Sequence, residues 1–148
     1  MDAVDRGWIG RKAGTSSLDI ERGRLRFFAR AIGETDPIYS DVVAARTAGY
    51  ADLPAPPTFL FSAELDSGAL DKVLKSMGVP TDQMLHAEQA FEYLRPAVAG
   101  DTITVDSLVK NIFKKKDGAL EFIQLEAKAT NQHGQHVATM NSLIVVRR

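Results

Sequence analysis

The spacing of apolar residues changes from a helical to an extended period near the middle of the chain, and this change restricts the fold more than any other feature. In the first half, one set of apolar residues recurs with the spacing of a helix face: Leu25, Phe28, Ala29 and Ile32. Asp19 or Ser17 is expected to cap the start of this helix, and Gly33 fits the position just past its end. A short helix is expected over residues 42–48, closed by Gly49.

A proline-rich segment separates these helices from a third helical region. Pro54, Pro56 and Pro57 cannot continue a helix, but proline is favoured in the first turn of a new one. The region after them has too many apolar side chains for a helix with one solvated face: Phe59, Leu60, Phe61, Ala63, Leu65, Leu70, Val73 and Leu74. The pattern predicts a buried central helix over about residues 58–74, with a break near Ser67 and Gly68.

The second half of the chain alternates apolar and polar side chains, as strands do. The alternation runs through four segments: residues 85–93, 102–113, 120–130 and 137–146. Gln89 interrupts the first segment, and the spacing in the second indicates a β-bulge. Asp117-Gly118 and residues 131–134 are hairpin signals. Three or four antiparallel strands after a helical half predict an α+β fold: one hotdog domain over residues 1–148, with an antiparallel sheet wrapped around a long central helix.

Composition and charge exclude several classes of function. The net charge of −1 gives no electrostatic basis for binding nucleic acid or an anionic membrane. No apolar run approaches the ~20 residues of a transmembrane helix. The chain has no cysteine, which excludes disulfides, thiolate catalysis and cysteine-based zinc sites. Residues 1–14 lack the apolar stretch of a signal peptide, so a cytoplasmic location is expected.

Short motifs follow one another along nearly the whole chain. They are residues 28–33 (FARAIG), 36–39 (DPIY), 44–46 (AAR) with 49–50 (GY), 56–59 (PPTF), 85–89 (LHAEQ), 95–96 (RP), 100–101 (GD) and 143–147 (LIVVR). This ordered set resembles the MaoC-like dehydratases, and more closely their FAS1-like N-terminal dehydratase branch. The resemblance implies a hotdog fold, usually a homodimer or heterodimer, that acts on acyl thioesters of coenzyme A or acyl carrier protein. The implied reaction is reversible hydration of a trans-2-enoyl thioester to the (R)-3-hydroxyacyl thioester, with no cofactor and no metal.

The resemblance also assigns a catalytic loop, and this chain departs from it. Active members carry a Gly-Asp-x-Asn-Pro-x-His segment that supplies the acid and base. Gly33 and Pro37 match this segment, whereas Glu34 stands for the Asp, Asp36 for the Asn and Tyr39 for the His. A phenol, with an ordinary pKa near ~10, cannot replace imidazole as a base near neutral pH without a large shift. Without the resemblance, the same residues form an ordinary turn, in which Asp caps and Pro fixes the next dihedral angle.

A second departure concerns the group that stabilises the thioester oxygen. The resemblance places a glycine N–H at the start of the central helix for this task. Pro57 stands at that position and has no N–H, so the N–H of Thr58 or Phe59 would have to serve. Glu34 and Tyr39 are therefore the candidate catalytic residues, and the candidate substrate-binding residues are Gly33, Asp36, Pro37, Ile38, Pro57, Thr58 and Phe59.

These departures leave three functions open and do not decide whether the chain alone is an enzyme. The favoured one is an acyl-binding, catalytically degenerate subunit. A second MaoC-like chain, which carries the complete motif, would supply the missing catalytic groups. The alternative is an active homodimeric hydratase/dehydratase that uses Glu34 and Tyr39. A hotdog thioesterase, in which Glu34 activates water, is the weaker alternative. His86 is interpreted as a solvated or hydrogen-bonded strand histidine, and residues 114–116 as a solvated hairpin end.

Overall fold

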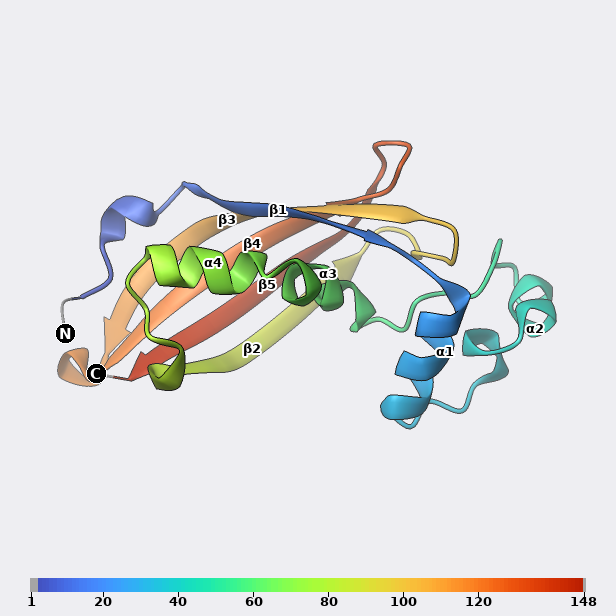
Figure 1. Ribbon diagram of the computed structural model, residues 1–148, viewed down its shortest axis with the longest axis horizontal. Helices are drawn as coiled ribbons and strands as arrows, with labels where there is room; N and C mark the ends of the chain where they lie inside the picture. The colour runs from blue at the N-terminus through green and yellow to red at the C-terminus, as the bar shows by residue number, and fades with distance from the viewer. Residues whose placement is uncertain (1–2, 148) are drawn as a thin grey trace.

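One antiparallel sheet forms the body of the protein, whose computed structural model describes residues 3–147 (Figure 1). Within that range the sheet has five strands in the order β1-β3-β4-β5-β2, and every neighbouring pair is antiparallel. The strands are β1 (Lys12–Asp19), β2 (Met84–Tyr93), β3 (Thr102–Lys115), β4 (Leu120–Thr130) and β5 (His136–Arg147). Because the sheet is open, β1 and β2 form its edges.

The helices divide into a pair that crosses the sheet and a pair beyond its end (Figure 1). The first pair is α3 (Ser62–Ser67) and α4 (Ala69–Ser76), and the second pair is α1 (Arg22–Ala31) and α2 (Val42–Thr47). Short 3-10 turns complete the helical structure: η1 (Arg6–Trp8), η2 (Pro37–Tyr39), η3 (Phe59–Phe61), η4 (Thr81–Gln83) and η5 (Lys116–Gly118). No helix in residues 3–147 is long and apolar enough to span a bilayer.

The predicted central helix is present, and it is broken where the sequence predicts. It begins as η3, continues as α3 and resumes as α4 after Gly68, whose φ of 66° lies in the left-handed region that glycine tolerates. Phe59 and Ala63 are fully buried against the sheet, as expected. Leu65, however, is 56% exposed, because it lies on the side of the short α3 opposite Ala63, while Glu64 is buried in its place.

The core has two parts, one under each half of the central helix. Under α4, Val73 and Leu74 share a cluster with sheet residues such as Ile123 and Ile144. The other cluster joins α1, α2 and the start of the central helix: Leu18, Ile20, Leu25, Ala45, Leu53, Phe59, Leu60, Ala63, Ala97, Ala99, Ile103, Val105, Ala127, Ala129, Val137, Ala138 and Met140. An edge-to-face contact of 5.2 Å between the Phe28 and Phe59 ring centroids fixes α1 against this helix.

Two expectations about the N-terminal half are wrong. Residues 12–19, placed in a helical half by the sequence, form β1, which pairs with β3. Ser17 and Asp19 therefore lie in a strand, and Asp19 Oδ1 accepts a 2.8 Å hydrogen bond from Thr102 Oγ1 instead of capping α1. Glu21 occupies the position before α1, and its side chain makes no capping hydrogen bond.

The four strands of the second half follow the prediction closely. The predicted bulge in β3 lies between Val109 and Asn111. A further bulge, which the sequence did not indicate, lies in β2 between His86 and Glu88. Because the bulge shifts the alternation by one residue, Gln89 shares a face with Phe91 and Tyr93, and Leu85 does not continue that face.

Candidate functional site

The loop after α1 carries the residues that sequence singles out, and it is fixed to α1 at both ends. The Glu34 N–H donates to the Ala29 carbonyl at 2.8 Å, which closes the helix through Gly33 (φ 74°). The Arg26 Nε donates to the Ser40 carbonyl at 2.8 Å at the far end of the loop. The loop is therefore held by a regular helix, although most of its side chains are solvent-exposed.

Asp52 joins the two outer helices to the proline-rich segment. Its carboxylate accepts hydrogen bonds from Arg22 Nε and Nη2 at 2.9 and 2.6 Å, and from the Leu53 N–H at 2.8 Å. Arg46 Nη2 on α2 lies 3.6 Å from the same carboxylate. Hydrogen bonding to Arg22 lowers the pKa of Asp52 to about 2, so this carboxylate is ionised at neutral pH.

The two carboxylates of the predicted catalytic loop are engaged with their own backbone. Glu34 Oε1 accepts from the N–H groups of Thr35 and Asp36, each at 2.9 Å. Asp36 Oδ1 accepts from the Ile38 N–H at 3.1 Å and so caps η2, which begins at Pro37. The turn interpretation of this segment therefore describes its local structure. In this geometry the carboxylates stabilise the loop.

Three tyrosines from distant parts of the chain line one small pocket, termed here the tyrosine pocket. Tyr39 comes from η2, Tyr50 follows α2 and Tyr93 ends β2. The remaining wall is apolar: Pro54, Ala55, Pro57, Pro96 and Ala97. The cavity measures about 250 Å³. None of these eight described lining residues is a histidine or an acid, so the pocket wall itself holds no general base for neutral pH.

A network of backbone and tyrosine hydrogen bonds fixes the proline-rich wall of the pocket. Tyr93 Oη donates to the Pro57 carbonyl at 2.6 Å. The Ala55 N–H donates to the Ala97 carbonyl, and the Ala99 N–H to the Leu53 carbonyl, both at 2.8 Å. Edge strand β2 and the following loop therefore hold the start of the central helix in place.

The electrostatic surroundings keep the phenols protonated. Burial raises the pKa of Tyr39, and the nearby carboxylates of Glu34 and Asp36 raise it further. Burial also raises the pKa of Tyr93. At neutral pH Tyr39 is consequently a neutral hydroxyl that donates and accepts hydrogen bonds, and it does not act as a base in place of imidazole.

The structure brings only part of the predicted site together. Tyr39 and Pro57 line the tyrosine pocket, and Glu34 and Asp36 act on Tyr39 through their charge. Sequence reasoning did not assign Tyr50 and Tyr93 to the site. Tyr50 belongs to the 49–50 motif of the resemblance, whereas the only sequence signal of Tyr93 is its place at the end of an expected strand.

The other predicted residues have varied surroundings. Gly33, Pro37 and Thr58 are exposed, and Ile38 is half-buried. Phe59 is fully buried in the core, where its ring contacts Phe28 and lies 5.5 Å from the Arg24 guanidinium.

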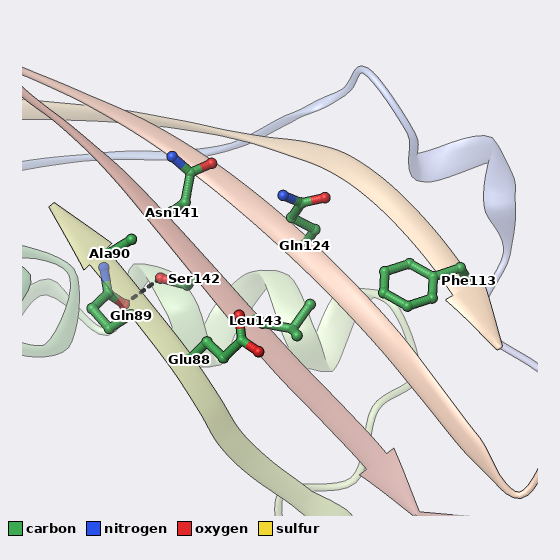
Figure 2. Close-up of a pocket in the computed structure, with 8 residues that line it drawn as sticks. All are labelled: Glu88, Gln89, Ala90, Phe113, Gln124, Asn141, Ser142 and Leu143. Atoms are coloured by element: carbon green, nitrogen blue, oxygen red, sulfur yellow. Dashed lines mark hydrogen bonds between the residues drawn. The ribbon is translucent and has the colours of Figure 1, made fainter. Parts of the chain in front are cut away.

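A larger cavity lies at the sheet and contains none of these residues (Figure 2). It measures about 550 Å³ and is lined by Glu88, Gln89, Ala90, Phe113, Gln124, Asn141, Ser142 and Leu143. Gln124 and Leu143 point away from the helices, because their neighbours Ile123 and Ile144 are buried beneath α4. Figure 2 shows the 2.5 Å hydrogen bond from Ser142 Oγ to Gln89 Oε1. Glu88 is its one acid, so the lining offers no acid–base pair.

The chain is similar over most of its length to known proteins. Residues 7–140 match the family model of the FAS1-like, dehydratase domain region. A UPF0336 protein of Streptomyces avermitilis is 32% identical over 146 residues, covering 98% of this chain and 96% of that protein. A solved MaoC-like dehydratase has a TM-score of 0.82 and 27% identity, covering 95% of this chain and 42% of that chain.

A second solved structure is a C-terminally truncated HadBC (3R-hydroxyacyl-ACP dehydratase) complex from Mycobacterium tuberculosis. It matches with a TM-score of 0.78 and 21% identity, covering 91% of this chain and 96% of the matched chain. These similarities confirm the α+β hotdog fold that the sequence predicts.

Proposed function

Because the chain belongs to the family of the FAS1-like dehydratase domain region, we propose that it is the acyl-binding subunit of an (R)-specific enoyl-thioester hydratase/dehydratase. In this proposal the chain receives an acyl thioester of coenzyme A or acyl carrier protein. A partner hotdog chain that carries the complete Gly-Asp-x-Asn-Pro-x-His motif supplies the acid and base. The chain alone is catalytically degenerate.

The tyrosine pocket is the observation that carries this proposal. Tyr39 occupies the sequence position of the imidazole, and its raised pKa keeps it from acting as a base at neutral pH. Glu34 and Asp36 each engage their own loop backbone. At the start of the central helix, Pro57 has no N–H to donate, and its carbonyl already accepts a hydrogen bond from Tyr93.

The missing catalytic groups should lower the hydration rate enough to distinguish a weak enzyme from a competent one. A positioned acid–base group typically contributes ~10²–10⁴-fold, and one oxyanion donor ~10²–10³-fold. These factors do not multiply when the groups act as a unit, but either loss alone leaves a poor catalyst. Binding survives better, because the walls formed by Pro54, Ala55 and Ala97 contribute apolar area.

The open sheet edge supports completion by a partner. β2 pairs with β5 on one side and is an edge of the described sheet on the other. Long edge strands are normally paired or protected. Tyr93, which holds the pocket wall, lies at the end of this same strand, so a partner chain added at β2 would adjoin the pocket. The similar HadBC structure is itself a complex of hotdog chains.

Thioester binding and turnover, measured separately, test the proposal. The purified chain is titrated with enoyl and 3-hydroxyacyl thioesters, and hydration is then followed with and without a partner chain that carries the full motif. We expect binding by the chain alone, little hydration, and a rate increase of at least ~10²-fold when the partner is added. The proposal is wrong if no thioester binds, or if the partner alone is as active as the mixture.

A further inference from the structure

The hydroxyl groups of the tyrosine pocket are not equivalent. Tyr93 Oη donates to the Pro57 carbonyl. Within residues 3–147, by contrast, the hydroxyls of Tyr39 and Tyr50 make no hydrogen bond, although both rings are half-buried. Neither of these two hydroxyl oxygens is among the buried polar atoms that lack a partner, so both are accessible from the pocket. The pocket therefore offers two uncommitted phenols to whatever occupies it.

The charges beside the pocket restrict which ligand oxygen suits these phenols. Glu34 and Asp36 lie close enough to Tyr39 to disfavour further negative charge there. A carbonyl oxygen that becomes an enolate would meet this repulsion. A neutral hydroxyl does not, and it can donate to one phenol while it accepts from the other.

We propose that Tyr39 and Tyr50 bind the C3 hydroxyl of an (R)-3-hydroxyacyl thioester, so that the chain prefers this species to the enoyl or saturated thioester. This inference rests on the proposed function, in which the 3-hydroxyacyl and enoyl thioesters are the two sides of the reaction. The saturated thioester is added as a reference. The apolar walls accept all three acyl chains, and the phenols alone distinguish them. Tyr39 and Tyr50 are then specificity-determining residues, and Tyr93 is a positioning residue that acts through Pro57.

The magnitude of the preference follows from the hydrogen bonds. A site built to bind a hydroxyl loses affinity for an analogue that lacks it, because its own polar groups remain unpaired. One such bond corresponds to about tenfold in the dissociation constant. We therefore expect the 3-hydroxyacyl thioester to bind about tenfold more tightly than the saturated thioester of the same length.

Calorimetric titration of the full chain tests the inference with three coenzyme A thioesters of one chain length: (R)-3-hydroxyacyl, trans-2-enoyl and saturated. Tyr39→Phe and Tyr50→Phe should each remove most of the preference and leave the affinity for the saturated thioester within about twofold. Tyr93→Phe is the matched control, because its hydroxyl is committed to Pro57. Tyr93→Phe should weaken the binding of all three thioesters by a similar factor and keep the preference for the 3-hydroxyacyl thioester.

The outcomes separate this inference from the proposed function. Equal binding of the three thioesters by the wild-type chain, or a preference that survives both Tyr39→Phe and Tyr50→Phe, overturns the inference while the proposed function stands. Failure of every thioester to bind overturns both. The Phe variants retain the aromatic ring, and their unfolding curves establish that altered binding is not a loss of fold.

Discussion

The hydroxyl of Tyr93 donates a 2.6 Å hydrogen bond to the carbonyl oxygen of Pro57, and this bond ties the edge strand of the sheet to the start of the central helix. The two residues are separated by 36 positions in the chain. Between them they close the tyrosine pocket, which also receives Tyr39 from the loop after α1. The geometry of the candidate site thus depends on a contact between the sheet and the helix-start loop.

Removing this contact should destabilise the protein measurably. Tyr93→Phe keeps the ring and loses the hydrogen bond, which contributes about 1 kcal/mol to the free energy of unfolding. Tyr50→Phe is the control, because its half-buried hydroxyl makes no hydrogen bond within residues 3–147, and its effect should stay below about 0.5 kcal/mol. Urea unfolding measures both. Equal effects of the two substitutions would show that the Tyr93 bond contributes nothing particular.

Asp52 should stabilise the outer helices in a pH-dependent manner. Its folded pKa of about 2 lies below the ordinary value of 3.8, so its contribution is present above that ordinary value and is lost as pH falls toward 2. We expect Asp52→Asn to cost about 1 kcal/mol at neutral pH, a figure reduced because Arg22 is half-exposed.

The exposed Asp71–Lys75 pair on α4 provides the comparison for Asp52. Asp71→Asn should cost less than about 0.5 kcal/mol at neutral pH. Urea unfolding at a series of pH values measures both variants. A difference between wild type and Asp52→Asn that is unchanged between neutral and acidic pH would contradict this account.

Glu64 should have the opposite pH dependence. It is 4% exposed, its Oε1 accepts a 2.6 Å hydrogen bond from Ser107 Oγ, and burial raises its pKa. Protonation of Glu64 therefore favours the folded state. This stabilisation is fully present below ~4.3, the pKa of Glu64 in the unfolded chain. It is lost as pH rises through the higher pKa of Glu64 in the folded protein. Glu64→Gln, which stays neutral, should become more stable than wild type as pH rises.

The measurement for Glu64 is the difference in unfolding free energy between variant and wild type across this range. The difference should grow by at most about 1.4 kcal/mol per pH unit. A difference that stays constant, or that favours wild type increasingly with pH, would show that the buried carboxylate is better solvated than the structure indicates.

Because β2 is an open edge strand, we expect the chain to associate with a second copy of itself or with another hotdog chain. We expect the chain to sediment as a dimer at micromolar concentration. Leu85 on β2 is 49% exposed, and Leu85→Glu should weaken the dimer by at least about tenfold, because it places a charge on an apolar contact. Ile9→Glu, at a site that is 38% exposed and far from β2 in the chain, is the matched control and should have little effect. A stable monomer in the wild type would count against this arrangement.

The sequence predicts most of the sheet because its strands are long and regularly patterned. The bounds expected for β4 are those observed, and the left-handed glycines at the ends of α1 and α2 follow from their positions. β1 could not be found in this way. Apart from Leu18, its buried residues are the small Ala13 and Ser16. Pairing with β3, and not the hydrophobicity of the segment itself, therefore makes it a strand.

The site was predictable only in part, for a different reason. Tyr39 and Pro57 lie in segments whose residues indicate a site, but the tyrosine pocket also needs Tyr50 and Tyr93. These residues come from elements far apart in the chain, and only the folded arrangement places them together. That Glu34 bonds to its own backbone is likewise a matter of side-chain orientation, which residue type does not determine.

Whether the chain alone is catalytic is decided by its rate of trans-2-enoyl thioester hydration, measured for the pure wild-type chain and for its Glu34→Gln variant. We expect a slow rate for wild type, at least ~10²-fold below that of the completed complex, and no further loss in Glu34→Gln. A full rate in the pure chain that Glu34→Gln abolishes would instead make Glu34 the catalytic carboxylate of an active homodimer.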